Sequence, residues 1–274
     1  MVNHSWCRSL LCMFLAVLVC SSMTIASTVE EVAASLTGKW AMVQFLVAAA
    51  DLPIVGTLYI DTIVGVLTEV TQTGSALVMQ DAYCFTDTYP STILFRTDIP
   101  DVVLQSIQPD PRTVALHDNG AGWEIIQDWH TEVRGAVFEF PETDELPTSA
   151  DDPRLVDIDG DGNPGMTILA EVLGLFQGEA YAVQRYRYSL QGTLVDEDTI
   201  IGQLQWTSEQ TIVAGTHDIL LLPFEDYTDP DSSKHRFIMK RVDDSWDSEL
   251  LRERLPEFLA ELGIERELDS QSEE

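Results

Sequence analysis

The stretch Gly56–Phe85, GTLYIDTIVGVLTEVTQTGSALVMQDAYCF, decides the fold class of this 274-residue chain. Its first part, Gly56–Glu69, is rich in Val, Ile, Leu, Thr and Tyr, which are residue types that favour strands. A short turn, Gln72–Ser75, follows, and strand-type residues resume at Ala76. Two such runs joined by a short turn that contains Gly predict an antiparallel β-hairpin.

Runs of the same kind continue along most of the chain, so we expect a mainly β protein. Residues 178–190 alternate along one strand, and both faces carry amphipathic groups, as in a barrel wall with a partly polar interior. The pattern predicts one antiparallel meander barrel of about eight to ten strands, or two small β-domains joined at an acidic linker. The expected strands are 92–97, 112–117, 135–140, 166–173, 178–190, 192–195, 199–213 and 236–242, while 123–134 fits either a strand or a helix.

Three helices are expected. Thr28 and Glu31 form a capping box that opens a short N-terminal helix to about Leu36. Residues 98–107 predict a second short helix with Pro near its start. A C-terminal amphipathic helix carries one apolar stripe, which should pack on the barrel; Pro256 should kink or split it. The stripe consists of Trp246, Leu250, Leu251, Leu255, Phe258, Leu259 and Leu262.

A tryptophan motif follows the first helix. Gly38-Lys-Trp40 at the start of the first strand resembles the lipocalin and related calycin barrels. In that family the Trp plugs the closed end of the barrel, often beneath an Arg from a late strand. The resemblance implies a lipocalin-like barrel in which Arg241 or Arg236 takes that part. The alternative is that Trp40 is an ordinary core aromatic.

The run Asp157-Ile-Asp159-Gly-Asp161-Gly162-Asn163-Pro164-Gly165 is the strongest candidate for chemistry. Three carboxylates alternate with other residues, and Gly162 stands at the sixth position, where a calcium loop turns sharply. Asn163 offers a backbone carbonyl at the seventh. Carboxylates this close repel one another without a cation, so the spacing predicts a structural calcium site.

The loop is not of the helix–loop–helix type, because Ile168 stands where the bidentate Glu is required. It resembles the loop of FG-GAP and similar extracellular β repeats, in which a D-x-D-G-D-G-x-P turn leads into a strand. The resemblance covers residues 157–168 once, and Gly165 replaces an acidic residue of those repeats. The ligand set is therefore short by one, and the alternative is an acidic turn that binds no metal tightly. The candidates to complete the set are Asp151, Asp152 and Glu171.

The N-terminus indicates export. Arg8 precedes a short apolar run that ends at Cys20, and small residues up to Ala26 suit cleavage, so residues 1–26 are predicted to be a signal peptide. Lipid anchoring through Cys20 is the alternative. We expect the mature protein in the periplasm, the cell envelope or the extracellular medium. One cysteine, Cys84, then remains outside the signal, so an internal disulfide is excluded.

The net charge is −31 at pH 7. Such an acidic chain argues against nucleic acid and anionic membrane surfaces as partners, because both require basic patches. The mature chain has no apolar run long enough for a transmembrane segment. We expect one β-barrel-like domain over residues 27–264, with the acidic linker and calcium loop at 141–165, and a disordered acidic tail over 265–274.

The sequence gives little sign of catalysis, and we lean towards a protein that is not an enzyme. In a regular strand Asp128, His130 and Glu132 would share one face, which we interpret as a solvated polar face. Three hypotheses about function remain. The first is a non-enzymatic, calcium-stabilised barrel that binds a small apolar ligand. The second is a surface or scaffold protein with a filled barrel and a protein partner, and the third is a hydrolase with an unrecognised active site.

Overall fold

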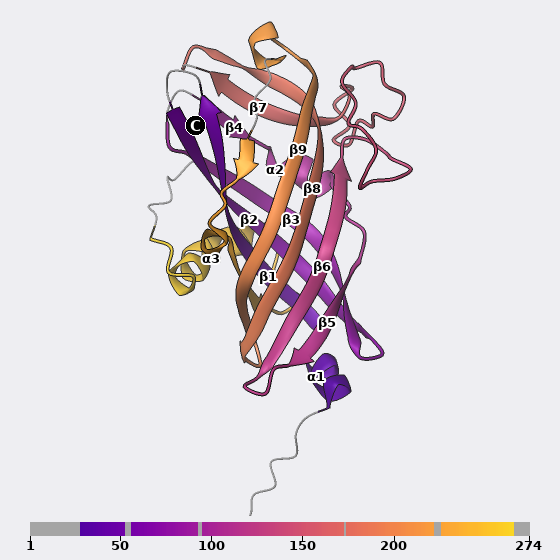
Figure 1. Cartoon of the computed structure of the whole chain (residues 1–274), viewed down its shortest axis with the longest axis vertical. Helices are drawn as coiled ribbons and strands as arrows, with labels where there is room; N and C mark the ends of the chain where they lie inside the picture. Colours follow the sequence, from indigo (N-terminus) through magenta and orange to yellow (C-terminus); the bar gives the residue numbers. More distant parts are fainter. Residues whose placement is uncertain (1–27, 53–55, 93–94, 173, 222–225, 266–274) are drawn as a thin grey trace, which may run out of the picture.

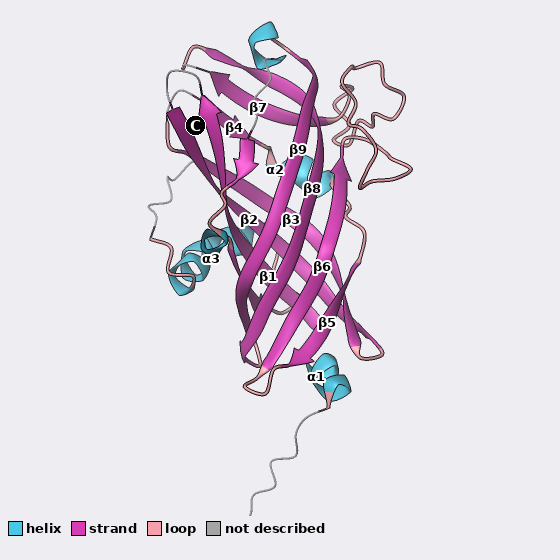
Figure 2. Ribbon diagram, in the orientation of Figure 1, coloured by secondary structure: helices cyan, strands magenta, loops and turns pink. Residues whose placement is uncertain are grey.

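The computed structural model describes residues 28–52, 56–92, 95–172, 174–221 and 226–265 (Figure 1). The expected signal peptide, with Cys20, and all but the first residue of the expected tail lie outside these ranges. The described part is mainly β, as predicted (Figure 2), and its strands belong to one antiparallel sheet that includes strands from both halves of the chain.

The predicted hairpin is confirmed. Strand β2 (Gly56–Thr73) pairs with β3 (Ala76–Pro90), and Gly74 makes the turn with a φ of 64°. This left-handed conformation suits Gly because it has no Cβ. Strand β1 (Gly38–Leu52) pairs with β2 along its whole length.

Eight strands close into a ring. Each ring strand pairs with the next ring strand along the chain, and the last one, β11, returns to the first one, β1. The ring therefore has the meander order that the sequence predicts. Its members are β1, β2 and β3, followed by β5 (Arg112–Asp118), β6 (Trp123–Arg134), β8 (Phe176–Asp196), β9 (Thr199–Gly215) and β11 (Arg236–Arg241).

Three short strands stand outside the ring. β7 (Met166–Val172) pairs with the first part of β8 and carries β4 (Phe95–Asp98) on its other side. β10 (Asp226–Thr228) pairs with β1. Helix α2 (Asp101–Ser106) follows β4, and Leu104 reaches the ring's inner core while Val103 packs on β7 and β8.

The inner face of the ring holds the main hydrophobic core. Large side chains such as Trp40, Phe237 and Tyr188 are almost completely buried there. Helix α1 (Val29–Ser35) lies at the end of the ring where β1 begins (Figure 1) and adds Val32 to this core. The capping box of Thr28 and Glu31 is present as predicted.

The contact expected between Trp40 and Arg241 is also present. The Arg241 guanidinium lies 4.6 Å from the centroid of the Trp40 ring and donates to the carbonyls of Ser35 and Thr37 at 2.5 and 2.9 Å. The Trp40 indole N–H donates to the Leu36 carbonyl at 3.0 Å. Arg241 thus satisfies carbonyl groups at the C-terminal end of α1, which helix ends leave without partners.

Helix α3 (Ser248–Glu261) packs on the outside of the ring. Its predicted apolar stripe meets the outward side chains of β1, β2, β3 and β11 in a second core, which also buries Cys84. Pro256 does not split the helix, because α3 is assigned without a break through this residue. Pro256 is exposed, so the backbone hydrogen bond it removes lies on the solvent side, and the packed stripe holds the helix on both sides of it.

Two further expectations need correction. Residues 135–140 do not form a strand, because Gly135 turns the chain away from β6 with a φ of 82° and only Ala136 makes an isolated bridge, to Leu155. The two predicted strands 178–190 and 192–195 are one strand, β8. Within the described ranges, no helix combines the length and the apolar character needed to cross a membrane.

Candidate functional site

The aspartate run lies in a long excursion between β6 and β7. Two glycines stand at its base, Gly135 at the start and Gly165 at the end, with φ values of 82° and 94°. A Cβ on either would lie 2.6 or 2.5 Å from the carbonyl oxygen of Ala182 on β8. Both positions therefore require Gly for its backbone conformation and for the close approach to β8.

Arginines hold the excursion against the outer face of the ring. Arg185 of β8 donates to the carbonyls of Pro141 (2.7 Å) and Asp144, and its guanidinium is buried. Within the excursion, Arg154 binds both carboxylate oxygens of Asp152, at 3.0 and 2.7 Å. The segment that the sequence identified as a linker is thus a folded loop with its own polar contacts.

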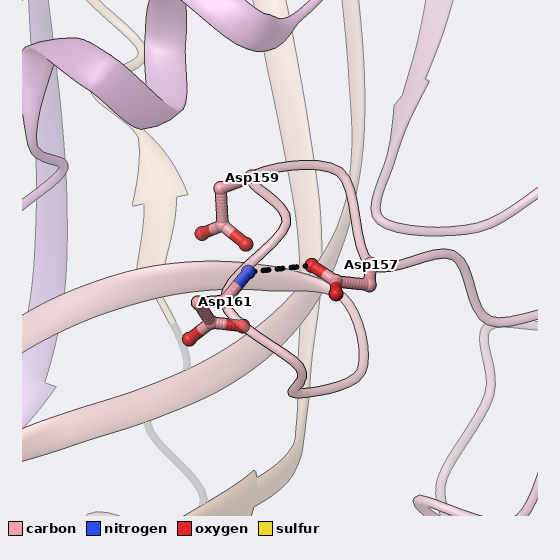
Figure 3. Close-up of side chains that lie close together, drawn as sticks. All are labelled: Asp157, Asp159 and Asp161. Atoms are coloured by element: carbon pink, nitrogen blue, oxygen red, sulfur yellow. Dashed lines mark hydrogen bonds between the residues drawn. The ribbon is translucent and has the colours of Figure 1, made fainter.

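The three predicted aspartates converge (Figure 3). Ligand oxygens of Asp157, Asp159 and Asp161 lie within 4.8 Å of one another. Asp157 accepts hydrogen bonds from the backbone N–H groups of Gly160 (2.7 Å), Asp161 (3.2 Å) and Gly162 (2.9 Å), which wraps the loop around its carboxylate. Among the residues described, these three form the one group of acidic, His or Cys side chains close enough to share an ion.

The loop is anchored to β7 by Thr167. Asp159 Oδ2 accepts from the Thr167 backbone N–H at 3.1 Å, and Asp161 Oδ2 accepts from its hydroxyl at 3.2 Å. These two bonds tie the aspartate cluster to the start of β7.

The electrostatics of the cluster favour a cation. A hydrogen bond from Asn163 leads the causes that lower the pKa of Asp161, so this carboxylate stays ionised. Beside the loop, the hydrogen bond to Glu179 raises the pKa of Tyr181 to about 12, with burial and the charges of Asp161 and Asp159 adding to the effect. The other oxygen of Asp159, Oδ1, is buried without a hydrogen-bond partner. A hard divalent cation suits such an oxygen.

The remaining predicted ligands are placed less favourably. The side-chain NH₂ group of Asn163 donates to Asp161 Oδ2 at 2.8 Å. The backbone carbonyl of Asn163 therefore remains the expected metal ligand. Asp152 is engaged by Arg154, and Glu171 accepts from Gln177 at 3.3 Å near the end of β7. Neither these two residues nor Asp151, the third candidate, belongs to the cluster, so none of the three supplies the acidic ligand that this chain lacks relative to the FG-GAP loops.

A second polar assembly, which sequence reasoning missed, lies inside the ring. Arg112 of β5 forms a two-pronged ion pair with Asp81 of β3, with N–O distances of 3.0 and 2.9 Å, and also donates to the Tyr188 hydroxyl at 3.1 Å. The side chains of the pair are 2% and 4% exposed. Burial, the largest single cause, disfavours the charge of Arg112, but Asp81 and Tyr188 together outweigh burial and the pKa of the guanidinium is raised.

A second ion pair lies beside the first. Glu132 accepts from the Tyr83 hydroxyl (2.8 Å) and from Arg134 (3.0 Å), while the Arg134 guanidinium lies 5.1 Å from the centroid of the Tyr186 ring. Burial is the largest cause that raises the pKa values of Tyr83 and Tyr186, so both phenols stay neutral. We call the two ion pairs and Tyr83, Tyr186 and Tyr188 the polar tier.

The polar tier corrects the interpretation of residues 128–132. A bulge between Gln127 and His130 shifts the register of β6. Asp128 therefore points to solvent, whereas Glu132 is buried and His130 stacks edge-on against Tyr188. His130 Nε2 is buried, 4.0 Å from Glu132 Oε1.

Comparison with protein-family models, curated proteins and solved structures finds no match to this chain. The site is therefore interpreted from its own geometry.

Proposed function

We propose that this chain is an exported, non-enzymatic, lipocalin-like barrel that binds a small apolar ligand inside the ring and is stabilised by calcium. The observation that carries the proposal is the closed meander ring, whose inner face is largely apolar outside the polar tier and which α1 and the Trp40–Arg241 contact cover at one end. Ligand sites in proteins are concave and mostly apolar with a few polar groups, and small barrels are a common place for them.

The ligand is proposed to lie in the half of the ring away from α1. Around α1 the inner face is filled by Trp40 and other large side chains. In the other half the inner face includes Leu46, Ala48, Leu58 and Ile60, and Ala48 leaves more room than a larger side chain. An apolar molecule bound there would contact side chains of β1 and β2.

Two experiments test ligand binding. Organic extraction of the purified protein followed by mass spectrometry should yield a bound apolar molecule. An environment-sensitive apolar dye should bind the wild type; Ala48→Phe, which fills the inner face, should weaken this binding at least tenfold, while Thr71→Phe on the outer face should not. A dye titration that is flat for all three proteins, with nothing extracted, would reject the proposal.

The calcium proposal is supported by the converging carboxylates and the buried Asp159 Oδ1. Calcium at about 100 times its dissociation constant stabilises a folded protein by about 2.7 kcal/mol. For a chain of this size, the melting temperature should therefore rise by roughly 5–10 °C over the value with chelator. Asp159→Asn should abolish this difference and exposed Asp110→Asn should keep it. Equal melting temperatures with calcium and chelator in the wild type would remove calcium from the proposal.

A filled barrel that binds a protein partner is the second candidate, and the polar tier favours it. Two buried ion pairs occupy the interior of the ring, and their charged atoms use each other as partners. This alternative would be supported if the folded protein bound no dye, yielded no lipid on extraction and still unfolded cooperatively. Export, with cleavage after Ala26 or lipidation of Cys20, is tested by the mass of the mature N-terminus.

A further inference from the structure

The wall of the ring is not made by β11 along its whole height. β11 begins only at Arg236, which pairs with Phe45 of β1 and Gln203 of β9. Both neighbours extend further, β1 to Leu52 and β9 to Gly215. Between these extensions lies the segment 226–235, which we call the strap; it contains β10 and the short 3₁₀ helix η2 (Ser232–Lys234).

The strap is bonded to both neighbouring strands. On one side, β10 pairs with Ala48–Ala50, and the Asp229 N–H donates to the Val47 carbonyl at 3.0 Å. On the other side, the Thr228 hydroxyl donates to the Trp206 carbonyl at 2.7 Å. The strap therefore completes the wall beside the half of the ring in which we place the ligand.

His235, at the end of the strap, joins all three segments through one imidazole. Its side chain is buried, and Nδ1 accepts from the Val47 backbone N–H at 3.3 Å and from the Trp206 indole N–H at 3.2 Å. With two donors directed at it, Nδ1 carries no proton. Nε2 must then hold the proton, and it donates to the Asp229 carbonyl at 2.9 Å.

We infer that the strap is an acid-sensitive side gate to the interior of the ring, with neutral His235 as its lock. A proton added to Nδ1 would face two N–H donors, so it would break the bonds to β1 and β9 and leave buried donors without an acceptor. Opening the strap frees Nδ1 from both donors and exposes it to water, which can accept a hydrogen bond from an added proton. Low pH therefore favours the open gate. The identity of what passes through the gate rests on the proposed ligand-binding function.

The charged groups around His235 do not offer a protonated Nδ1 a new partner inside the closed strap. On the strap, Asp229 pairs with Lys234 at 2.6 Å, and Asp231 caps η2. Because Lys234 already neutralises Asp229, an imidazolium would not gain an unpaired carboxylate. β1 and β9 offer the Val47 amide and the Trp206 indole, which carry no charge, and Tyr59 of β2 touches the Lys234 ammonium.

Hydrogen exchange measured by NMR tests the gate without any ligand. Exposed imidazoles gain a proton as pH falls through about 6.5. If opening of the strap is linked to the uptake of one such proton, its equilibrium constant should rise about tenfold between about pH 7.5 and pH 5.5. After correction for intrinsic exchange, the protection factors of the Val47 and Asp229 amides should fall by this factor. Amides of the β2–β3 hairpin, which report global unfolding, should be more strongly protected than these strap amides at both pH values, because opening the gate leaves the hairpin folded.

His235→Gln is the decisive variant, because a Gln side chain both accepts and donates but does not titrate; its Val47 protection should not change with pH. Exposed His117→Gln should behave as the wild type. If His235→Gln does not fold, the wild-type comparison of strap and hairpin amides still decides. Equal protection of the strap and hairpin amides, or equal pH dependence of the Val47 amide in wild type and His235→Gln, would overturn the gate. Because this experiment uses no ligand, that result would not affect the proposal of ligand binding. In the same way, failure to bind the dye would not affect the proposal of a gate.

Discussion

Breaking one half of the buried Asp81–Arg112 pair should destabilise the protein more than removing both halves. Asp81→Leu leaves the guanidinium almost fully buried, with the Tyr188 hydroxyl as its remaining oxygen partner. An uncompensated buried charge costs about 3–5 kcal/mol. Asp81 also accepts from the Thr68 hydroxyl at 2.7 Å, and losing that bond adds about 1 kcal/mol. We therefore expect a loss of about 4–6 kcal/mol for Asp81→Leu.

The double variant Asp81→Leu/Arg112→Met should recover most of this loss. Replacing both members of a buried ion pair with apolar residues is often neutral. The hydroxyls of Thr68 and Tyr188 lose partners, so we expect a net loss of about 1–2 kcal/mol. Equilibrium urea unfolding at pH 7, followed by tryptophan fluorescence, gives the free energies for both single variants and the double variant.

The exposed pair Arg254–Glu257 on α3 is the matched control. Its side chains are 46% and 57% exposed, so solvent screens the pair and the same cycle should give a coupling energy far below that of Asp81–Arg112. If the losses of Asp81→Leu and Arg112→Met add in the double variant, the two residues are not coupled. The account of the polar tier as neutralised ion pairs would then be wrong.

Three further changes have defined outcomes. Pro256→Ala should raise the unfolding free energy by about 1–3 kcal/mol in urea, because it restores a backbone hydrogen bond in α3. Gly165→Ala should lower it by about 1–3 kcal/mol, since the added Cβ meets the Ala182 carbonyl at a positive φ. Arg154 lowers the pKa of Asp152 to about 2, so their contact contributes above about pH 4 and is lost as pH falls through 2. Asp152→Asn should therefore speed pepsin cleavage of residues 136–156 at pH 4, with little difference from wild type at pH 2.

Much of the fold could be predicted from residue periodicity. The β2–β3 hairpin, the capping box of α1 and the stripe of α3 each follow from local patterns. The resemblance carried by the GxW motif left two candidates for the partner of Trp40, Arg241 and Arg236, and Arg241 is the one that lies over its ring. The three aspartates were expected to converge because close spacing in a glycine-rich turn leaves little freedom. Such features need only short-range information.

The polar tier could not be predicted because its partners are far apart in the chain. A signal was present: Asp81 stands between Met79 and Tyr83 on the inward face of β3, where an isolated charge needs a partner. Identifying Arg112 as that partner required the ring's register. The β6 bulge could not be predicted either, because it is a shift in the pairing of β6 with β8. Trp129, which lies in the bulge, has its ring centroid 5.6 Å from the Arg187 guanidinium, and this contact exists only once the two strands pair.

The closing pair of the ring has a consequence for how the chain folds. Trp40 of β1 pairs with Arg241 of β11, so the edge of β1 stays without that partner until nearly the whole chain has emerged from the ribosome. Contacts between residues so distant in sequence slow folding, and an unpaired apolar edge invites aggregation meanwhile. Loss of β11 through a truncated C-terminus would leave β1 and β9 as two open edges, which favours self-association over a smaller monomer.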